Sequence, residues 1–175
     1  INDAELKGKI DEIISHISYS SREIIRNENT RGVIFIAYKG PSLDGHDFID
    51  TALDNGATCI IAEHITKAQE KRAICTVLVS DSVIAKAQIA CNAFGNPSHE
   101  ISLIGVTGTN GKTTVTTLLT QALEHLGAKT GLIGTVDIRY ADTILPNSQT
   151  TPDTLYINMH LRNMISYGCT HCCIE

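Results

Sequence analysis

The segment from Gly105 to Thr114, GVTGTNGKTT, holds the residues of this chain that are best suited to bind a polyphosphate. Its glycines allow a tight turn in which successive backbone N–H groups point at phosphate oxygens. Lys112 can then reach the terminal phosphates, and the hydroxyl of Thr113 can ligate Mg²⁺. The alternative is a glycine-rich connection between a strand and a helix that binds nothing.

A strand and a helix must hold this segment in place. The apolar run 101–106 predicts a buried strand before it, and apolar residues at helical spacing over 112–126 predict a helix after it. The first turn of that helix offers unpaired N–H groups and the positive end of the helix dipole, which favour an anion. The strict phosphate-loop pattern needs glycine where this chain has Val106, so the match is to a shorter variant, GTNGKTT.

Polar residues elsewhere in the chain are expected at the same end of the sheet. Glu175 directly follows an apolar run, 169–174, that predicts another buried strand. Because ligands of open parallel sheets bind outside the carboxyl ends of the strands, Glu175 can complete a Mg²⁺ site opposite Thr113, or it is a solvated terminal residue. Thr150 and Thr151 precede a predicted helix, 153–167, and can either cap it or donate to a bound anion.

The remaining elements predict two α/β domains. In the first, 1–97, we expect strands at 33–38, 59–62 and 74–79 and helices at 2–17, 46–55 and 82–94. Asn96-Pro97-Ser98 ends the last helix and marks the boundary. In the second, 98–175, a strand at 129–135 and a hairpin of 136–140 with 143–145 complete the pattern, and the sheet is expected to be cut off part-way through a domain.

Composition excludes several classes of protein. With 14 Lys and Arg against 19 Asp and Glu, the net charge of −5 argues against nucleic acid as a partner. No apolar run reaches the roughly 18–20 residues of a membrane span, so no membrane insertion is expected. The six cysteines lie mostly in apolar runs, which suits buried thiols in a reducing cytoplasm.

Three groups of residues together resemble the Mur ligases, the ATP-dependent amide-forming enzymes of peptidoglycan synthesis. The first group is the phosphate loop, 105–114. The second is SSR at 20–22 with VIFIAYKG at 33–40 and DGHDFI at 44–49, similar to the uridine-nucleotide domain of the family. The third is QTTPD at 149–153 with Ile174-Glu175, similar to the members that add the third amino acid. The resemblance covers essentially the whole chain.

The resemblance implies a fold and a set of site residues. The fold is a small N-terminal α/β domain for the uridine nucleotide, followed by the truncated start of a parallel-sheet ATPase domain with its phosphate loop. ATP is expected at Gly108, Thr109, Asn110, Gly111, Lys112, Thr113 and Thr114, with Lys112 as the catalytic residue. Mg²⁺ is expected at Thr113 and Glu175. The UDP-MurNAc-dipeptide substrate is expected at Tyr19, Ser21, Pro41, Ser42, Leu43, Gln149, Thr150 and Thr151. Two positions depart from the family pattern, since Ser20 is usually aspartate and Gln149 is commonly asparagine.

The resemblance also implies the reaction. A substrate carboxylate attacks the γ-phosphate of ATP, and the amine of a free diamino acid then displaces phosphate to form the amide. The enzyme is cytoplasmic and serves cell-wall synthesis, and this 175-residue piece is expected to be inactive alone because the amino-acid-binding domain is missing. The alternatives are the family member that adds D-Ala-D-Ala to the tripeptide and a nucleotide-binding module without catalysis.

Overall fold

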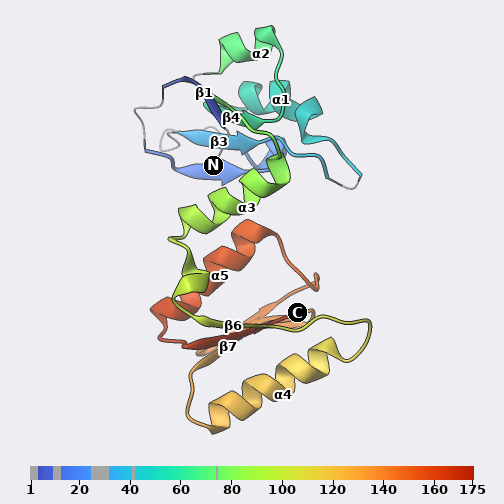
Figure 1. Cartoon of the computed structure of the whole chain (residues 1–175), viewed down its shortest axis with the longest axis vertical. Helices are drawn as coiled ribbons and strands as arrows, with labels where there is room; N and C mark the ends of the chain where they lie inside the picture. Colours follow the sequence, from blue (N-terminus) through green and yellow to red (C-terminus); the bar gives the residue numbers. More distant parts are fainter. Residues whose placement is uncertain (1–3, 10–12, 25–31, 41, 74) are drawn as a thin grey trace. The chain divides into compact units, whose positions relative to one another are not determined.

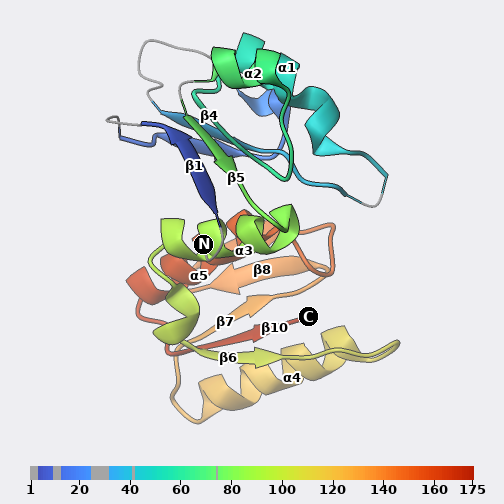
Figure 2. The ribbon, with the colours of Figure 1, turned by 45° about the horizontal axis from the view of Figure 1, so that its top comes forward.

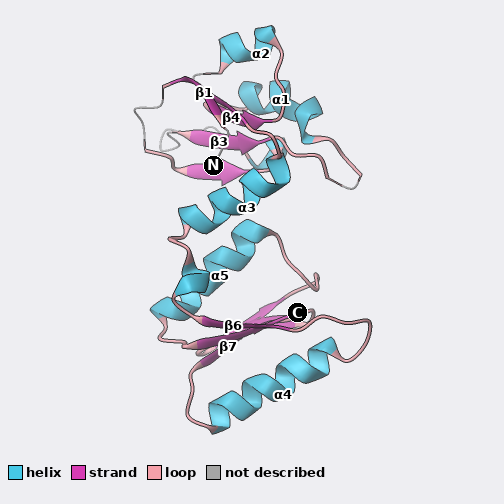
Figure 3. Cartoon of the chain, in the orientation of Figure 1, coloured by secondary structure: helices cyan, strands magenta, loops and turns pink. Residues whose placement is uncertain are grey.

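The computed structural model describes residues 4–9, 13–24, 32–40, 42–73 and 75–175. The chain divides into two compact units, 1–88 and 89–175, and each contains one five-stranded sheet (Figures 1 and 3). The predicted α/β class is therefore confirmed. The division falls inside helix α3 (Ser82–Ala93), and the domain boundary expected after residue 97 stays a prediction.

The sheet of the first unit has the strand order β1-β5-β4-β3-β2. Four of its strands are parallel: β2 (His16–Ser18), β3 (Val33–Ile36), β4 (Cys59–Ala62) and β5 (Cys75–Leu78). Strand β1 (Glu5–Gly8) lies antiparallel beside β5, as Figure 2 shows. Every residue of β4 is buried, which fits its continuous apolar run CIIA. The strands expected at 33–38 and 59–62, and at 74–79 over its described residues, are confirmed.

The helix expected over 2–17 is wrong. Strand β1 and strand β2 occupy its described ends, and residues 10–12 lie outside the described part of the chain. Isoleucines at helical spacing suggested the helix, but β-branched residues also suit a strand. Gly8 has φ +86°, a left-handed conformation that interrupts any helix there.

Short helices cover one face of this sheet. They are the 3₁₀ helices η1 (Ser21–Glu23) and η2 (Gly45–Phe48) and the α-helices α1 (Ile49–Asp54) and α2 (Lys67–Arg72). Apolar side chains of η2 and α1 join those of β3 and β4 in one core. Its buried members are Ile24, Val33, Phe35, Ala37, Ile49, Ala52, Ala57, Ile60 and Ala62.

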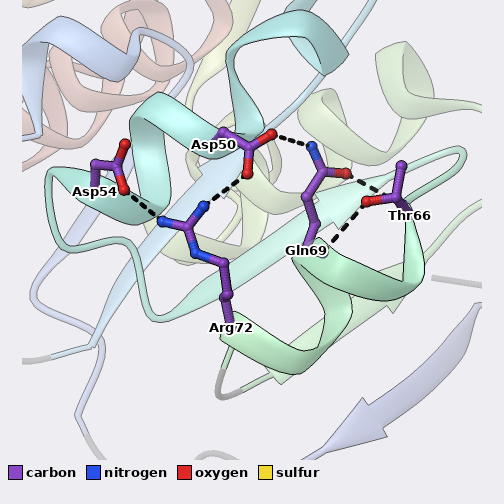
Figure 4. A network of polar contacts seen from close by, with 5 residues as sticks. All are labelled: Asp50, Asp54, Thr66, Gln69 and Arg72. Carbon is purple, nitrogen blue, oxygen red and sulfur yellow. Dashed lines mark hydrogen bonds and ion pairs between the residues drawn. The ribbon is translucent and has the colours of Figure 1, made fainter.

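Polar contacts on the surface of the first unit join α1 to α2 (Figure 4). Arg72 donates to Asp50 at 2.7 Å and also to Asp54, and Gln69 donates to Asp50 at 2.8 Å. The side chains of Thr66 and Gln69 form a capping box that begins α2. Because these groups are exposed, each ion pair contributes little stability, and the network chiefly fixes where α2 lies on α1.

The sheet of the second unit is mixed, with the order β6-β10-β7-β8-β9. Strands β6 (Ser102–Gly105), β10 (His171–Ile174) and β7 (Thr130–Ile133) are parallel. The predicted hairpin is confirmed as β8 (Asp137–Tyr140) and β9 (Thr143–Pro146), which continue the sheet as antiparallel strands. A 3₁₀ turn, η3 (Pro97–His99), precedes β6.

Two helices cover the two faces of this sheet, α4 (Lys112–His125) and α5 (Thr154–Ser166), as Figures 1 and 3 show. The α5 side holds the apolar core, which includes Ile133, Ile138, Leu161, Met164 and Cys172. Gly131 on β7 allows the close approach of α5, because a Cβ at this position would overlap the sulfur of Met164. The α4 side is more polar: Thr116 and Thr120 are buried, and each hydroxyl donates to a carbonyl four residues earlier.

Arg162 of α5 fixes the segment that leads into β6. Its guanidinium donates to the carbonyls of Phe94 at 2.8 Å and Gly95 at 3.0 Å and forms an ion pair with Glu100 at 2.8 Å. The three acceptors lie on both sides of the Asn96-Pro97 turn, where Asn96 has φ +53°. One side chain therefore holds this turn against α5.

Candidate functional site

The phosphate loop occupies the turn between β6 and α4, as the sequence predicts. Gly111 precedes the helix with φ +79°, and Gly108 has φ +150°, conformations that glycine adopts at no steric cost. The ammonium of Lys112 donates to the carbonyl of Gly108 at 2.8 Å, so the side chain folds back across the loop. Thr109, Asn110 and Thr114 are exposed around it, open to a ligand.

The carboxylate of Glu175 meets this loop from the end of β10. Its Oε2 accepts from the hydroxyls of Thr113 at 3.0 Å and Thr135 at 3.1 Å, and its Oε1 accepts from the backbone N–H of Thr135 at 3.0 Å. Only 8% of Glu175 is exposed. The two residues expected to bind Mg²⁺ are therefore in contact, and the carboxylate is held by three donors before any ion arrives.

The two threonines before α5 lie in the same network. Thr151 donates from its hydroxyl to the backbone carbonyl of Glu175 at 3.1 Å, and the hydroxyls of Thr150 and Thr135 are 3.2 Å apart. Asp153 caps α5 by accepting from the N–H of Leu155 at 2.9 Å. Neither threonine is therefore the cap, and their donation to a bound anion stays a prediction.

Gln149 is linked to this network through its backbone. Its side chain is exposed, while its backbone carbonyl accepts from the amide of Asn147 at 2.7 Å. The same amide donates to the carbonyl of Gly134 at 2.6 Å. Asn147 thus joins the segment that carries Gln149 and Thr150 to the turn after β7.

These groups suit a hydrated divalent cation and a phosphate. A hydroxyl and a carboxylate are the oxygen ligands that Mg²⁺ takes beside phosphate oxygens and water. The start of α4, which has 14 residues, supplies N–H groups to the same end of the sheet. Within the described residues, no group of three or more His, Cys, Asp or Glu side chains gathers as a metal site.

A cavity of about 340 Å³ in the first unit collects the other predicted residues. Tyr19, Ser21, Ser42 and Leu43 line it, whereas Pro41 lies outside the described residues. The rest of its wall is formed by Ser20, Arg22, Tyr38, Gly40, Gly45 and Phe48. Aromatic rings, hydroxyls and one guanidinium in one cavity fit a ligand with a flat base and anionic groups.

The loop beside this cavity has a defined geometry. Gly45 donates to the carbonyl of Tyr38 at 2.8 Å, and a Cβ at position 45 would come within 2.7 Å of the Tyr38 backbone. Buried His46 accepts at Nε2 from the N–H of Glu63 at 3.1 Å, so its proton is on Nδ1, which lies 2.6 Å from Asp44. The backbone N–H and the ring of His46 lower the pKa of Asp44 by hydrogen bonding to its carboxylate.

Several site residues were missed by the sequence analysis. Thr135 holds Glu175 through two hydrogen bonds, and Asn147 positions the segment at 149. Tyr38 and Arg22 line the cavity. Both lie in motifs that resemble the family, yet neither was predicted as a contact of the substrate. The available signal was position alone: Thr135 and Tyr38 each follow the carboxyl end of a parallel strand, where ligands bind.

Comparison with known proteins matches both parts of the chain. Residues 14–102 match the model of the Mur ligase family, catalytic domain, and residues 106–175 match the Mur ligase middle domain. The chain is 40% identical to the UDP-N-acetylmuramoyl-L-alanyl-D-glutamate–2,6-diaminopimelate ligase of Cytophaga hutchinsonii over 97% of its own length, and it spans 34% of that protein.

Solved structures agree on the fold. A UDP-N-acetylmuramoyl-L-alanyl-D-glutamate–2,6-diaminopimelate ligase has a TM-score of 0.68 at 22% identity, with 94% of this chain and 33% of that one covered. The MurF ligase of Thermotoga maritima in complex with ADP has a TM-score of 0.56 at 29% identity, with 93% and 32% covered. Because one family model covers just over half of the chain and a second covers most of the rest, the chain belongs to the Mur ligase family.

Proposed function

We propose that this chain is the nucleotide-binding part of an ATP-dependent ligase that adds a diamino acid to UDP-MurNAc-L-Ala-D-Glu. The observation that carries the proposal is the contact of Thr113 with Glu175 beside the phosphate loop. This contact places a hydroxyl and a carboxylate, which suit Mg²⁺, beside a loop that can bind phosphate. The relatives that match the chain along almost its full length carry names with this substrate and with 2,6-diaminopimelate.

The chemistry begins with two anions that must meet. A carboxylate oxygen of the dipeptide attacks the γ-phosphorus of ATP, the bond to the bridging oxygen breaks, and ADP leaves with that electron pair. The amine of the incoming amino acid then attacks the acyl phosphate, loses a proton and expels inorganic phosphate. Repulsion between the carboxylate and the triphosphate opposes the first step, so charge neutralisation and positioning are what the protein must supply.

The residues of the chain fit these tasks. Lys112 exchanges its contact with the Gly108 carbonyl for the transferring phosphoryl group, and the N–H groups at the start of α4 hold the neighbouring phosphates. Thr113 and Glu175 would hold Mg²⁺, which when bound would offset the negative charge of the phosphates. Thr135 fixes the Glu175 carboxylate, and Thr150 and Thr151, which have hydrogen bonds to Thr135 and Glu175, are the proposed contacts of the muramoyl-dipeptide end of the substrate.

The first unit has a separate task in this proposal. Tyr19, Ser21, Ser42 and Leu43, with Pro41 as a further predicted contact, hold the uridine diphosphate end of the substrate. The cytoplasm is the proposed compartment, because the described cysteines are all free thiols. No helix among the described residues is long and apolar enough to cross a membrane.

Calorimetry on the 175-residue chain tests the proposal at the level of binding. We expect UDP and ATP with Mg²⁺ each to bind once and without competition, since their sites lie in different units. For the protein that contains these units, we expect ATP-dependent release of phosphate only when dipeptide substrate and diamino acid are both present. Hydroxylamine in place of the amino acid should trap the acyl phosphate as a hydroxamate. Failure to bind either nucleotide would leave the proposal without support.

A further inference from the structure

The ammonium of Lys86 lies against two tyrosine rings at once. Its Nζ is 4.3 Å from the ring centroid of Tyr19 and 4.0 Å from that of Tyr38. The two rings are edge to face, with their centroids 5.9 Å apart and an angle of 80° between their planes. Both distances are well inside the range of about 6 Å over which a cation is attracted to an aromatic face. One charge therefore holds two rings in a fixed mutual orientation.

The three residues come from distant parts of the first unit. Tyr19 lies between β2 and η1, Tyr38 follows β3, and Lys86 lies in the second turn of α3. Both tyrosines line the cavity of about 340 Å³, while Lys86 is not part of its lining. The ammonium thus contacts the rings from outside the cavity and is half-buried there. Through this contact, helix α3 reaches the aromatic wall of the cavity.

An aromatic wall needs such support to bind a flat ligand. A base stacks well only if the ring that receives it keeps its orientation, and a ring that is free to turn loses entropy on binding. A half-buried cation shared by two rings opposes rotation of either one, because a turned ring would lose its contact with the ammonium. The anionic end of a nucleotide has other partners in the cavity, the hydroxyls of Ser20, Ser21 and Ser42 and the guanidinium of Arg22.

We propose that Lys86 is a positioning residue for the nucleotide base, acting through Tyr19 and Tyr38 and not through contact with phosphate. The inference rests on the proposed function, in which this cavity takes a uridine nucleotide. It assigns base affinity to a residue of α3 that no motif of the sequence marks. It also separates two sources of affinity, the rings for the base and the serines with Arg22 for the diphosphate.

The test is a comparison of Lys86→Met and Lys86→Arg in the 175-residue chain. Methionine keeps an unbranched stem without charge, and arginine keeps a cation that stacks on aromatic rings. Calorimetry with uridine and with UDP should show both affinities reduced by the same factor, about tenfold, in Lys86→Met. Lys86→Arg should stay within about threefold of the wild type. Lys71→Met, an exposed lysine of α2 in the same unit, is the matched control and should change neither affinity.

A second measurement does not depend on any ligand. The chain has five tyrosines and no tryptophan, so near-ultraviolet circular dichroism reports mainly on tyrosine environments. We expect Lys86→Met to weaken this band and Lys86→Arg to restore it, with an unchanged far-ultraviolet spectrum and unchanged ATP binding in both variants.

Two results would overturn the inference. The first is an unchanged tyrosine band in Lys86→Met. The second is unchanged uridine affinity in that variant; if its UDP affinity falls at the same time, Lys86 is a phosphate ligand. If the wild type binds neither uridine nor UDP while the tyrosine band still responds, the proposed function of the cavity fails and the role of Lys86 in holding the rings stands.

Discussion

The hydroxyl of Thr113 donates to the carboxylate of Glu175 across 3.0 Å, although 62 positions of sequence separate the two residues. The first belongs to the opening turn of α4 and the second follows β10, the strand that pairs with both β6 and β7. The contact joins the phosphate loop to an interior strand of the sheet. A cation placed there would be held by two elements whose relative position the sheet already determines.

Replacement of Glu175 by glutamine should separate metal binding from stability. The amide oxygen of glutamine can still accept from the Thr135 N–H, and the hydroxyls of Thr113 and Thr135 can turn to accept from its NH₂ group. We expect the free energy of unfolding to change by less than about 1 kcal/mol. The Mg²⁺-dependent affinity for ATP should fall more than tenfold, because the anionic ligand is gone. Calorimetry at several Mg²⁺ concentrations measures the second effect.

Glu175→Leu is the contrasting variant. It leaves the Thr135 N–H without its acceptor, and we expect a loss of about 1–3 kcal/mol of stability in urea unfolding. Equal stability of the leucine and glutamine variants would contradict the account of how Glu175 is held.

Lys112→Met should affect nucleotide binding and little else. The ammonium contacts only the exposed Gly108 carbonyl among the described hydrogen bonds, so its loss should change stability by no more than about 0.5 kcal/mol. ATP affinity should fall by about ten- to hundredfold, the value of a charge-assisted contact with phosphate. Lys129→Met, at an exposed lysine of the same unit, is the control. A similar loss of ATP affinity in both variants would point to net charge and not to the position of Lys112.

Gly131→Ala should destabilise the second unit by about 1–3 kcal/mol through overpacking. The new Cβ would overlap the sulfur of Met164, whose side chain is fully buried. Urea unfolding measures the effect, and the double variant with Met164→Ala should recover part of it. Gly105→Ala is the matched control, since a Cβ there meets no atom within 4 Å. If the two alanine variants lose the same stability in urea, the close approach of α5 to β7 is not the reason for glycine at position 131.

The ion pair of Arg162 with Glu100 predicts a dependence of stability on pH. Hydrogen bonding to Arg162 lowers the pKa of Glu100 below its ordinary value of 4.5 in the folded state. The stabilisation is therefore fully present above pH 4.5 and is lost as the pH falls through the lowered pKa. We expect Arg162→Ala to be less stable than the wild type at pH 7, and the difference in urea midpoint should narrow as the pH falls below 4.5.

Glu100→Gln distinguishes the ion pair from the other contacts of Arg162. It retains the bonds from Arg162 to the carbonyls of Phe94 and Gly95, so it should be less damaging than Arg162→Ala at pH 7. The difference in urea midpoint between Glu100→Gln and the wild type should also narrow as the pH falls below 4.5. If the difference in urea midpoint from the wild type stays constant with pH in both variants, the Glu100 carboxylate is not the source of the stabilisation.

Local patterns predicted the parts of the fold in which neighbouring residues decide the structure. The run before Gly105, the glycines and the helical spacing after Lys112 specified the strand, turn and helix of the phosphate loop. The hairpin of β8 and β9 was likewise readable from two short runs and a turn. Helix α2 was missed even though Thr66 and Gln69 carry the spacing of a capping box, which the structure forms.

Other features depend on contacts between distant residues and could not be derived from local pattern. Five isoleucines and leucines at helical spacing suggested a helix over 2–17. The described residues at the two ends of this segment instead form strands, because β1 pairs with β5 and β2 pairs with β3. Thr135 gave no signal beyond its place after a strand, because its role depends on Glu175, 40 positions away. The contact of Lys86 with Tyr19 and Tyr38 is of the same kind.

The position of β10 has a consequence for biosynthesis. This strand lies between β6 and β7, and it is the last of the five strands to leave the ribosome. Until it arrives, β6 and β7 have no parallel partner between them, and the helices that will cover the sheet have no complete surface to pack on. Pairing of β10 with β6 closes a long loop of chain, and such closure is slow compared with local folding. A nascent second unit therefore carries its phosphate loop before Glu175, the partner of Thr113, has been synthesised.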